Sequence, residues 1–481
     1  MLHVSPVPEG EPRFEGYEIR VNDRPVSAHR ARVSSMPYNT VWPGRQRPLD
    51  QTEIAPFLMI EANEAFTVTV EYPFSPEEVV VRPLSRGVRA DVSGRRARLT
   101  VERPGQYTVE ADGFHQALHL FVDAPRDFGV KPSDPNVVYF GPGVHRPGVV
   151  RLHSGQTAYV DRDAVVYGAF EALDSEDVRV CGRGIIDGSF ETRTTGDNFY
   201  LVDPERRLPR MSAAELDAIL RRQRVLKAGL KFWSCRRVSV EGCVLRDTDT
   251  FALLPGGCDG VFIDGVKTIG MWRYNSDGID LINTSHAVIR NCFVRDFDDC
   301  IVIKGAVGYD DLNCASISVE NCVIWCDWGR ALEIGAETNA PEYRDIVMRD
   351  CDVIHGSTVN LDIQHHNHAF IHDILYENIR IEYTKHQLSD VYQHDMSAPY
   401  QPPAPVRHPV PMGIYILNSG LFNDVDYRNG SVRDVTYRNI AVVTEPGVPT
   451  PVPEFRSLDA EHAIDGVRIE NYTVDASQSR E

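Results

Sequence analysis

Residues 288–294 read VIRNCFV, and the same pattern returns as ISVENCV at 317–323 and as IVMRDCDV at 346–353. Further copies are VSVEGCV at 238–244, ILYENIRI at 374–381, VTYRNIAV at 435–442 and VRIENYTV at 467–474. In each copy a short β-branched run meets a polar residue or glycine and then a second apolar run. The central residues Asn291, Asn321, Asp350, Asn378, Asn439 and Asn471 are separated by 30, 29, 28, 61 and 32 residues. The interval of 61 corresponds to two turns, one of them weakly marked.

A period near 30 with several short strands indicates a repeat whose units stack and share one continuous core. The alternation excludes helical repeats. A (β/α)₈ barrel needs a helix after every strand, and only residues 212–226 show a capping box and an apolar helical stripe. The pattern therefore predicts a right-handed parallel β-helix. Its turns stack about 4.8 Å apart, so we expect core ladders of asparagine and of cysteine, with members Asn291, Asn321, Asn378 and Asn439, and Cys292, Cys322 and Cys351.

The first 125 residues have a different sequence pattern, with alternating β-branched runs at 66–72, 79–82, 88–92, 97–101, 106–110 and 118–122. Turn residues separate these runs, as in a small antiparallel sandwich. We therefore predict an all-β chain with a β-sandwich at 1–125, a linker at 126–136 and the β-helix catalytic domain at 137–481.

The overall charge limits the classes of partner that the protein is expected to bind. The chain has 481 residues, with 50 Lys and Arg against 69 Asp and Glu, for a net charge of −19. This balance argues against nucleic acid and against an anionic membrane surface. No apolar run is long enough to span a bilayer, and residues 1–12 do not resemble a signal peptide. We expect a cytoplasmic protein, or a secreted one if a leader was removed, with all ten cysteines as buried thiols.

Two acidic segments interrupt the repeat: YNSDGID at 274–280 and RDFDDCIVIKG at 295–305. Positions 21 and 22 residues apart fall on adjacent turns, so Asp277 and the pair Asp298 and Asp299 are expected to converge on one outer face. Crowded carboxylates repel one another, and one of them then stays protonated as a general acid. Glycosidic bond cleavage needs such an acid and a second carboxylate to activate water. The alternative is a solvated acidic loop, but the apolar strand that follows Asp299 favours a site.

These motifs resemble the polygalacturonase family of glycoside hydrolases, family 28, whose fold is a right-handed parallel β-helix. The resemblance rests on Asn-Ser-Asp at 275–277, Asp-Asp-Cys at 298–300 and GRGIIDG at 182–188. It implies Asp298 as general acid, Asp277 and Asp299 as holders of the attacking water, and inversion at the anomeric carbon. It also implies Lys304 and Asn275 as substrate contacts.

The sequence departs from the family pattern downstream of Lys304. Arg330 stands where the family has histidine, with Glu333 three residues on, and the family's Arg-Ile-Lys is replaced by NLDIQHH at 360–366. Without that basic pair a galacturonate carboxylate lacks its partner, so we expect a neutral or uncommon glycan rather than pectin. The predicted substrate contacts are Asn275, Lys304, Arg330, Glu333, Gln364, His365, His366 and Trp272. Arg330 and Glu333 form a structural ion pair in the alternative interpretation.

The histidines at 365, 366 and 368 raise the question of a metal. On a strand only two of them share a side, so we predict no metal and no cofactor. The proline-rich segment 386–411 carries no repeat and is expected to form a rim of the substrate cleft.

The sequence thus predicts an inverting glycoside hydrolase that acts on a polysaccharide or oligosaccharide, with its oligomeric state left open. Two alternatives remain on the same fold. A polysaccharide lyase or glycan-rearranging enzyme would release unsaturated products and respond to chelators. A non-catalytic carbohydrate-binding β-helix would bind glycan without turnover.

Overall fold

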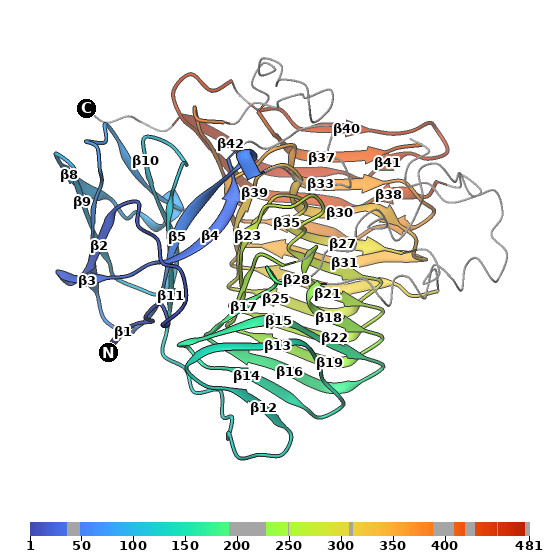
Figure 1. Ribbon diagram of the computed structural model, residues 1–481. Helices are drawn as coiled ribbons and strands as arrows, with labels where there is room; N and C mark the ends of the chain where they lie inside the picture. Colours follow the sequence, from blue (N-terminus) through green and yellow to red (C-terminus); the bar gives the residue numbers. More distant parts are fainter. Residues whose placement is uncertain are drawn as a thin grey trace.

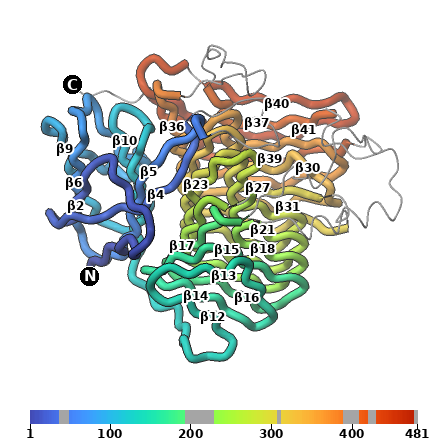
Figure 2. The backbone as a smooth tube through the Cα atoms, viewed as in Figure 1, coloured from blue at the N-terminus to red at the C-terminus, as the bar shows by residue number. Residues whose placement is uncertain are grey.

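The computed structural model describes residues 1–35, 49–191, 228–248, 250–306, 311–387, 408–418, 429–449 and 451–476. Within these ranges the only helical elements are two short 3₁₀ turns, η2 (Leu49–Gln51) and η3 (Leu84–Arg86). None of the helices in these ranges is long and apolar enough to cross a membrane. The helix predicted at 212–226 and most of the proline-rich segment 386–411 fall outside the described residues. Everything else is strand and turn, in two bodies that lie side by side (Figures 1 and 2).

The first body is a sandwich of two sheets made by strands β1 to β11. All of its pairings are antiparallel except that of β5 with β11. Valine, leucine and isoleucine side chains from both sheets interdigitate in one core. The first sheet contains β1 (Leu2–Val4), β4 (His29–Ser34), β5 (Thr52–Ala62), β7 (Val79–Arg82), β10 (Gly105–Ala111) and β11 (Leu118–Asp123). The second contains β2 (Glu18–Val21), β3 (Arg24–Val26), β6 (Phe66–Glu71), β8 (Ala90–Ser93) and β9 (Arg96–Val101).

The second body is a right-handed parallel β-helix of 31 strands, in which each turn pairs with the next in parallel register. We call its three faces the site sheet, the junction sheet and the outer sheet. The site sheet comprises β18 (Ala228–Trp233), β21 (Phe251–Gly256), β24 (Ile279–Ile282), β27 (Ile301–Gly305), β30 (Arg330–Thr338), β33 (Val359–His365), β37 (Val410–Ile416) and β40 (Glu454–Arg456). The junction sheet comprises β17 (Ile185–Asp187), β20 (Val244–Arg246), β23 (Lys267–Met271), β26 (Phe293–Asp296), β29 (Val323–Cys326), β32 (Asp352–His355) and β36 (Arg380–Tyr383).

The outer sheet comprises β12 (Val137–Phe140), β14 (Thr157–Val160), β16 (Glu176–Gly182), β19 (Arg236–Glu241), β22 (Asp259–Asp264), β25 (Ser285–Arg290), β28 (Cys314–Glu320), β31 (Glu342–Arg349) and β35 (Ile374–Glu377). Four long strands, β13 (Gly143–Arg151), β15 (Ala164–Leu173), β39 (Val435–Thr444) and β42 (Arg468–Ala476), and three short ones, β34 (Phe370–Ile371), β38 (Ser431–Arg433) and β41 (Ile464–Asp465), complete the helix. Inward side chains of all three faces fill one core that runs the length of the helix.

The repeated asparagine marks the bend between the outer and junction sheets. Each ladder residue has a positive φ, for example 58° at Asn291 and 51° at Asn321, and asparagine tolerates this left-handed conformation better than most residues. The ladder is therefore real, but it lies at the surface and not in the core as predicted. The cysteine ladder is in the core, and all ten thiols are free and buried.

The side-chain amides of the ladder bond in one direction, each donating to the preceding turn. One run ends on Asp264, which accepts from Asn291, and Asn291 accepts from Asn321, both at 2.7 Å. The second run ends on Asp350 and continues through Asn378, Asn439 and Asn471. Asn439 bonds directly to Asn378, and β35 pairs with β39, so the 61-residue interval is a single turn and the prediction of two turns was wrong. Because an ionised aspartate cannot donate, the ladder is interrupted between Asn321 and Asp350.

The sandwich packs on the junction sheet, which leaves the site sheet clear of it. Apolar side chains of β4, β5 and β11 meet those of β23, β26 and β29 in a third core. Beside this core, the buried guanidinium of Arg82 bonds to Glu110 of the sandwich and to Glu382 and Glu445 of the helix, at 2.5 to 2.9 Å. The two bodies are therefore joined by both apolar packing and buried ion pairs.

Candidate active site

Two turns of the helix bring the acidic motifs together at the start of the site-sheet strands. Asp277 lies just before β24, and Asp298 and Asp299 lie just before β27. The register pairs Ile279 with Ile301, so Asp277 and Asp299 occupy equivalent positions 22 residues apart. The convergence expected from the spacing is present in the structure.

Glycines on either side allow this close stacking. A Cβ on Gly278 would lie 2.3 Å from the carbonyl oxygen of Cys300, and one on Gly329 would lie 2.4 Å from the carbonyl carbon of Asp298. Both distances are far below van der Waals contact. The backbone that carries Asp298 and Asp299 is thus held between two turns that only glycine permits.

Lys304, on β27, is the first of two cations at the site. Its Nζ lies 2.6 Å from Oδ2 of Asp277, 3.1 Å from Oδ2 of Asp280 and 3.4 Å from Oδ2 of Asp299. The side chain is 4% exposed. A single buried ammonium therefore serves three carboxylates.

Arg330, at the start of β30, is the second cation. Its backbone N–H donates to Oδ1 of Asp299 at 3.2 Å, and its guanidinium lies 3.7 Å from the same oxygen. The guanidinium is also 4.0 Å from Glu333 and 3.6 Å from Asp362, which are register partners on β30 and β33. Gln364 donates to Asp362 at 3.0 Å. Arg330 thus links the Asp277–Asp299 group to a second acidic group on the next turns.

The site is strongly acidic. Within the described part of the chain, its seven buried carboxyl groups face Lys304 and Arg330, which leaves an excess of five negative charges among these nine groups if every acid were ionised. Burying unpaired charge costs several kcal/mol per group, so the excess is relieved by protonation. The seven groups are Asp277, Asp280, Asp298, Asp299, Glu333, Glu337 and Asp362.

The two adjacent aspartates have opposite protonation preferences. Burial and the charges of Asp277 and Asp299 raise the pKa of Asp298 well above its ordinary value. Burial also acts to raise the pKa of Asp299, but Lys304 and Arg330 outweigh it and hold that pKa below the ordinary value. For Asp277, burial raises the pKa to about 6 against the opposing effect of Lys304. One acid stays protonated beside one that stays ionised, which is the arrangement that general acid–base catalysis needs.

Residues 213–394, which include all seven carboxyl groups, match the family model described as Glycosyl hydrolases family 28. This segment is less than half of the chain, so the match shows a likeness to the family 28 glycoside hydrolases. No curated protein sequence matches this chain. Among solved structures, Dex49A from Penicillium minioluteum superposes with a TM-score of 0.56 at 13% identity, over 98% of this chain and 91% of that one.

Two further structures are similar at lower scores. An exopolygalacturonase from Thermotoga maritima has a TM-score of 0.44 at 15% identity, covering 70% of this chain and 84% of its own. An endo-xylogalacturonan hydrolase from Aspergillus tubingensis has a TM-score of 0.44 at 12% identity, covering 72% and 86%. The family 28 match supports hydrolysis of glycosidic bonds and favours it over the lyase and the purely binding alternatives.

The remaining predicted substrate contacts differ in their burial and in their hydrogen bonds. Asn275 is nearly buried, in a left-handed conformation, and its Oδ1 has no hydrogen-bond partner among the described residues. Trp272 is 8% exposed and its indole N–H donates to Asp247 at 3.0 Å. His365 is fully buried with Nδ1 2.7 Å from the Thr338 hydroxyl, and His366 is nearly buried. Their roles as sugar contacts stay predictions.

Three acidic members of the site were not assigned a role from the sequence. Asp280 bonds Lys304, Asp362 lies against Arg330, and Glu337 is buried nearby at the end of β30. The 29-residue spacing between Glu333 and Asp362 equals one turn and was the available signal. This spacing could place Asp362 beside Glu333 only once the register of β30 against β33 was known.

Proposed function

We propose that this protein hydrolyses a neutral polysaccharide or oligosaccharide with inversion, with Asp298 as the general acid and Asp277 and Asp299 as the groups that hold the attacking water. The observation that carries this proposal is the contrast between Asp298 and Asp299. Lys304 lies within 3.4 Å of Asp277 and Asp299, whereas no ion pair reaches Asp298 within the described part of the chain. The protonated acid and the ionised bases are thereby separated.

The proposed step follows from these positions. The Asp298 carboxyl donates its proton to the glycosidic oxygen as the bond to the anomeric carbon breaks, and water attacks the opposite face of the sugar. Lys304 occupies Oδ2 of Asp277, while Oδ1 is buried and has no partner among the described residues. That oxygen and the Asp299 carboxylate are placed to hold the attacking water, and one of the two carboxylates takes the single proton that the water loses. The cycle ends when this carboxylate releases its proton to solvent and Asp298 takes one up.

The charge of the site supports a neutral substrate. Lys304 and Arg330 are each surrounded by acids, so neither is left for a sugar carboxylate. Burial lowers the pKa of His365 to about 3 and that of His366 to about 4, so both rings are neutral. A uronate would add an unpaired buried charge to a group already in excess of negative charge.

A substrate panel tests this proposal. The full-length protein is incubated with neutral glucans, galactans, mannans and xylans and with polygalacturonate, and reducing ends are measured. We expect turnover of one neutral class and little or none of polygalacturonate. Polygalacturonate hydrolysis at a rate comparable to the best neutral glycan would overturn the substrate assignment and point to Arg330 or Lys304 as a carboxylate anchor.

A further inference from the structure

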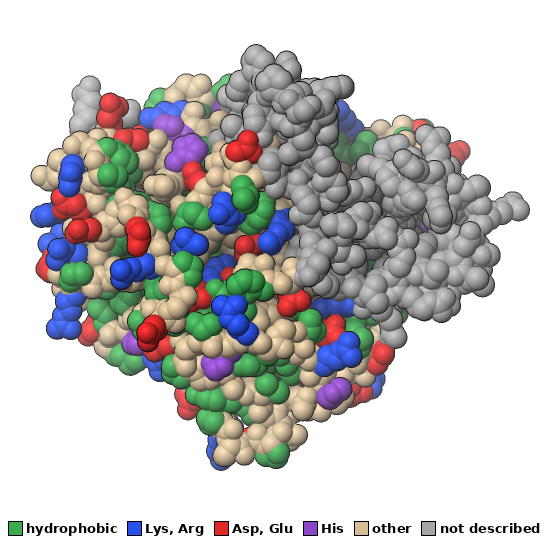
Figure 3. All heavy atoms as spheres, in the orientation of Figure 1, with side chains coloured by type: hydrophobic (Ala, Val, Ile, Leu, Met, Phe, Trp, Pro, Cys, Tyr) green, Lys and Arg blue, Asp and Glu red, His purple; other side chains and the backbone are tan. Residues whose placement is uncertain are grey.

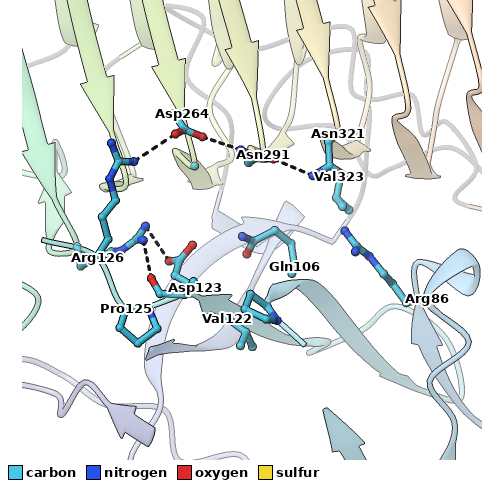
Figure 4. Close-up of a pocket in the computed structure, with 15 residues that line it drawn as sticks. Arg86, Gln106, Val122, Asp123, Pro125, Arg126, Asp264, Asn291, Asn321 and Val323 are labelled. Carbon is cyan, nitrogen blue, oxygen red and sulfur yellow. Dashed lines mark hydrogen bonds and ion pairs between the residues drawn. The ribbon is translucent and has the colours of Figure 1, made fainter. Parts of the chain in front are cut away.

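A second cavity lies between the sandwich and the β-helix, away from the site sheet. It has a volume of about 440 Å³ and opens to solvent. The sandwich contributes Arg86 and Gln106, and the helix contributes Asn291, Asn321 and Val323 at the bend between the outer and junction sheets (Figure 4). The volume is within the range of about 300 to 1,000 Å³ typical of small-molecule sites.

Most of the charged groups around this cavity already have partners. Arg126 pairs with Glu241 and lies 3.2 Å from Asp264. Asp123 accepts from Lys267 and lies 3.2 Å from Arg183. These pairs fix the walls and neutralise the two aspartates, so they are not the groups that would recognise a ligand.

Three groups are left uncommitted, and they come from both bodies. Gln106 is only 6% exposed, and its Oε1 is buried without a hydrogen-bond partner among the described residues. The Nε of Arg86 is likewise buried and unpartnered. Asn321 lines the cavity from the helix, where it is exposed and donates to Asn291, and no hydrogen bond to its Oδ1 is found among the described residues. In Figure 4 the Gln106 amide and the Arg86 guanidinium both point into the cavity.

The chemistry of these groups selects the ligand. Gln106 Oε1 and Asn321 Oδ1 need hydrogen-bond donors, while Arg86 needs an acceptor. Adjacent hydroxyl groups supply both. A phosphate or sulfate would satisfy Arg86 but leave the buried Gln106 oxygen unpaired, and an unpaired buried acceptor is costly. A hydrocarbon ligand would leave Gln106 and Arg86 without partners.

We propose that this cavity is a second saccharide-binding site, which takes one or two neutral sugar units through Arg86, Gln106 and Asn321. A sugar here contacts the sandwich and the helix at once, so the sandwich is part of a glycan-binding surface. The site is distinct from the carboxylates and does not depend on the hydrolytic mechanism. On the face shown in Figure 3, acidic and basic side chains are interspersed outside the grey atoms.

Ligand-observed NMR titration of the full-length protein tests the proposal, with glucose, galactose, mannose and xylose as probes and inorganic phosphate as the competing class. We expect saturable, millimolar binding of at least one sugar. Arg86→Met and Gln106→Leu should each weaken it by about tenfold, the effect of one polar contact. Arg89→Met, an exposed arginine three residues along the same segment, is the matched control and should bind as the wild type does.

The hydrolysis rate and thermal stability of the variants provide independent checks. Both should stay at the wild-type level in Arg89→Met, which lies outside both sites, and Gln106→Leu should keep its thermal stability because the lost carbonyl has no partner among the described residues. Equal sugar affinity in all four proteins would place any bound sugar elsewhere and overturn the proposal. Binding of phosphate but of no sugar would also overturn it, and so would the absence of any sugar binding. A failure of the hydrolytic proposal would instead appear as no turnover with the sugar titration intact.

Discussion

Replacing Lys304 by methionine removes the cation that lies within 3.4 Å of Asp277, Asp280 and Asp299. Methionine keeps the length of the buried stem. Breaking a buried ion pair by removing one partner costs about 3 to 5 kcal/mol, because the other charge stays buried. The protein can relieve this cost by protonating the carboxylates. We therefore expect the pKa of Asp299 to rise and the attacking water to lose its base at neutral pH.

The expected consequences are a fall in kcat of about 10² to 10⁴ at pH 7 and a shift of the acidic limb of the pH profile to higher pH. The lowered pKa of Asp299 also determines how the stability of the fold depends on pH. Because Lys304 holds the Asp299 pKa below its unfolded value, the stabilisation is present above about pH 4 and is lost as the pH falls. The loss of stability in the variant should thus be largest near neutral pH and shrink in acid.

The assay combines a pH–rate profile with urea unfolding at each pH. Lys267→Met is the matched control: Lys267 is also buried and pairs with Asp123, but at the junction with the sandwich. It should lower stability without moving the pH profile. A folded Lys304→Met protein with wild-type kcat and an unshifted acidic limb would refute the assignment of Asp299 and Asp277 as bases.

Four further predictions concern the carboxyl groups and the junction. Asp298→Asn should lower kcat by about 10² to 10⁴ with substrate affinity kept, and steady-state kinetics retaining a tenth of the wild-type rate would show that another residue is the acid. The acidic limb of wild-type kcat/KM should lie near pH 6, following the pKa of Asp277; a limb near pH 4 would contradict that assignment. Burial raises the pKa of Asp362 to about 7, so this side chain keeps a proton in the folded protein that the unfolded chain loses above about pH 4. The wild type therefore loses stability as the pH rises from 4 to 7, and the Tm of Asp362→Asn should rise relative to that of the wild type over this range. A constant Tm difference would argue against the raised pKa. Arg82→Met should cost about 3 to 5 kcal/mol in urea unfolding, and a cost below about 1 kcal/mol would mean that the junction does not rely on this ion cluster.

Much of the fold could be predicted because the spacing of a sequence repeat gives the length of one turn. The copies around Asn291 and Asn321 gave the turn length, and the alternation at 66–72 and 97–101 gave sandwich strands close to β6 and β9. The strands before residue 66 were not predicted. β1 to β3 are only three or four residues long, and β5 is a nearly continuous apolar run containing Pro56 and has no clear alternation. The predicted location of the asparagine ladder in the core was wrong. The spacing shows that these residues stack from turn to turn, but it does not show the backbone conformation at the bend, where each has a positive φ and its side chain lies at the surface.

The candidate site could be predicted only where one turn had a known length. The 22-residue interval placed Asp277 beside Asp299. The contacts of Asp280 with Lys304 and of Asp362 with Arg330 depend on strand register and on which alternate side chain faces outward, and local sequence does not specify either. The junction cavity was not foreseen, because Gln106 and Asn321 come from different bodies.

The stereochemistry of the first-formed product tests the central claim most directly. Proton NMR during the first minutes of hydrolysis of the best neutral substrate distinguishes the two anomers before they equilibrate. We predict that the newly formed reducing end has the configuration opposite to that of the cleaved bond, because Asp298 donates the proton while Asp277 and Asp299 direct water to the other face. A product of retained configuration would contradict the account, since it would require one of these carboxylates to attack the sugar itself.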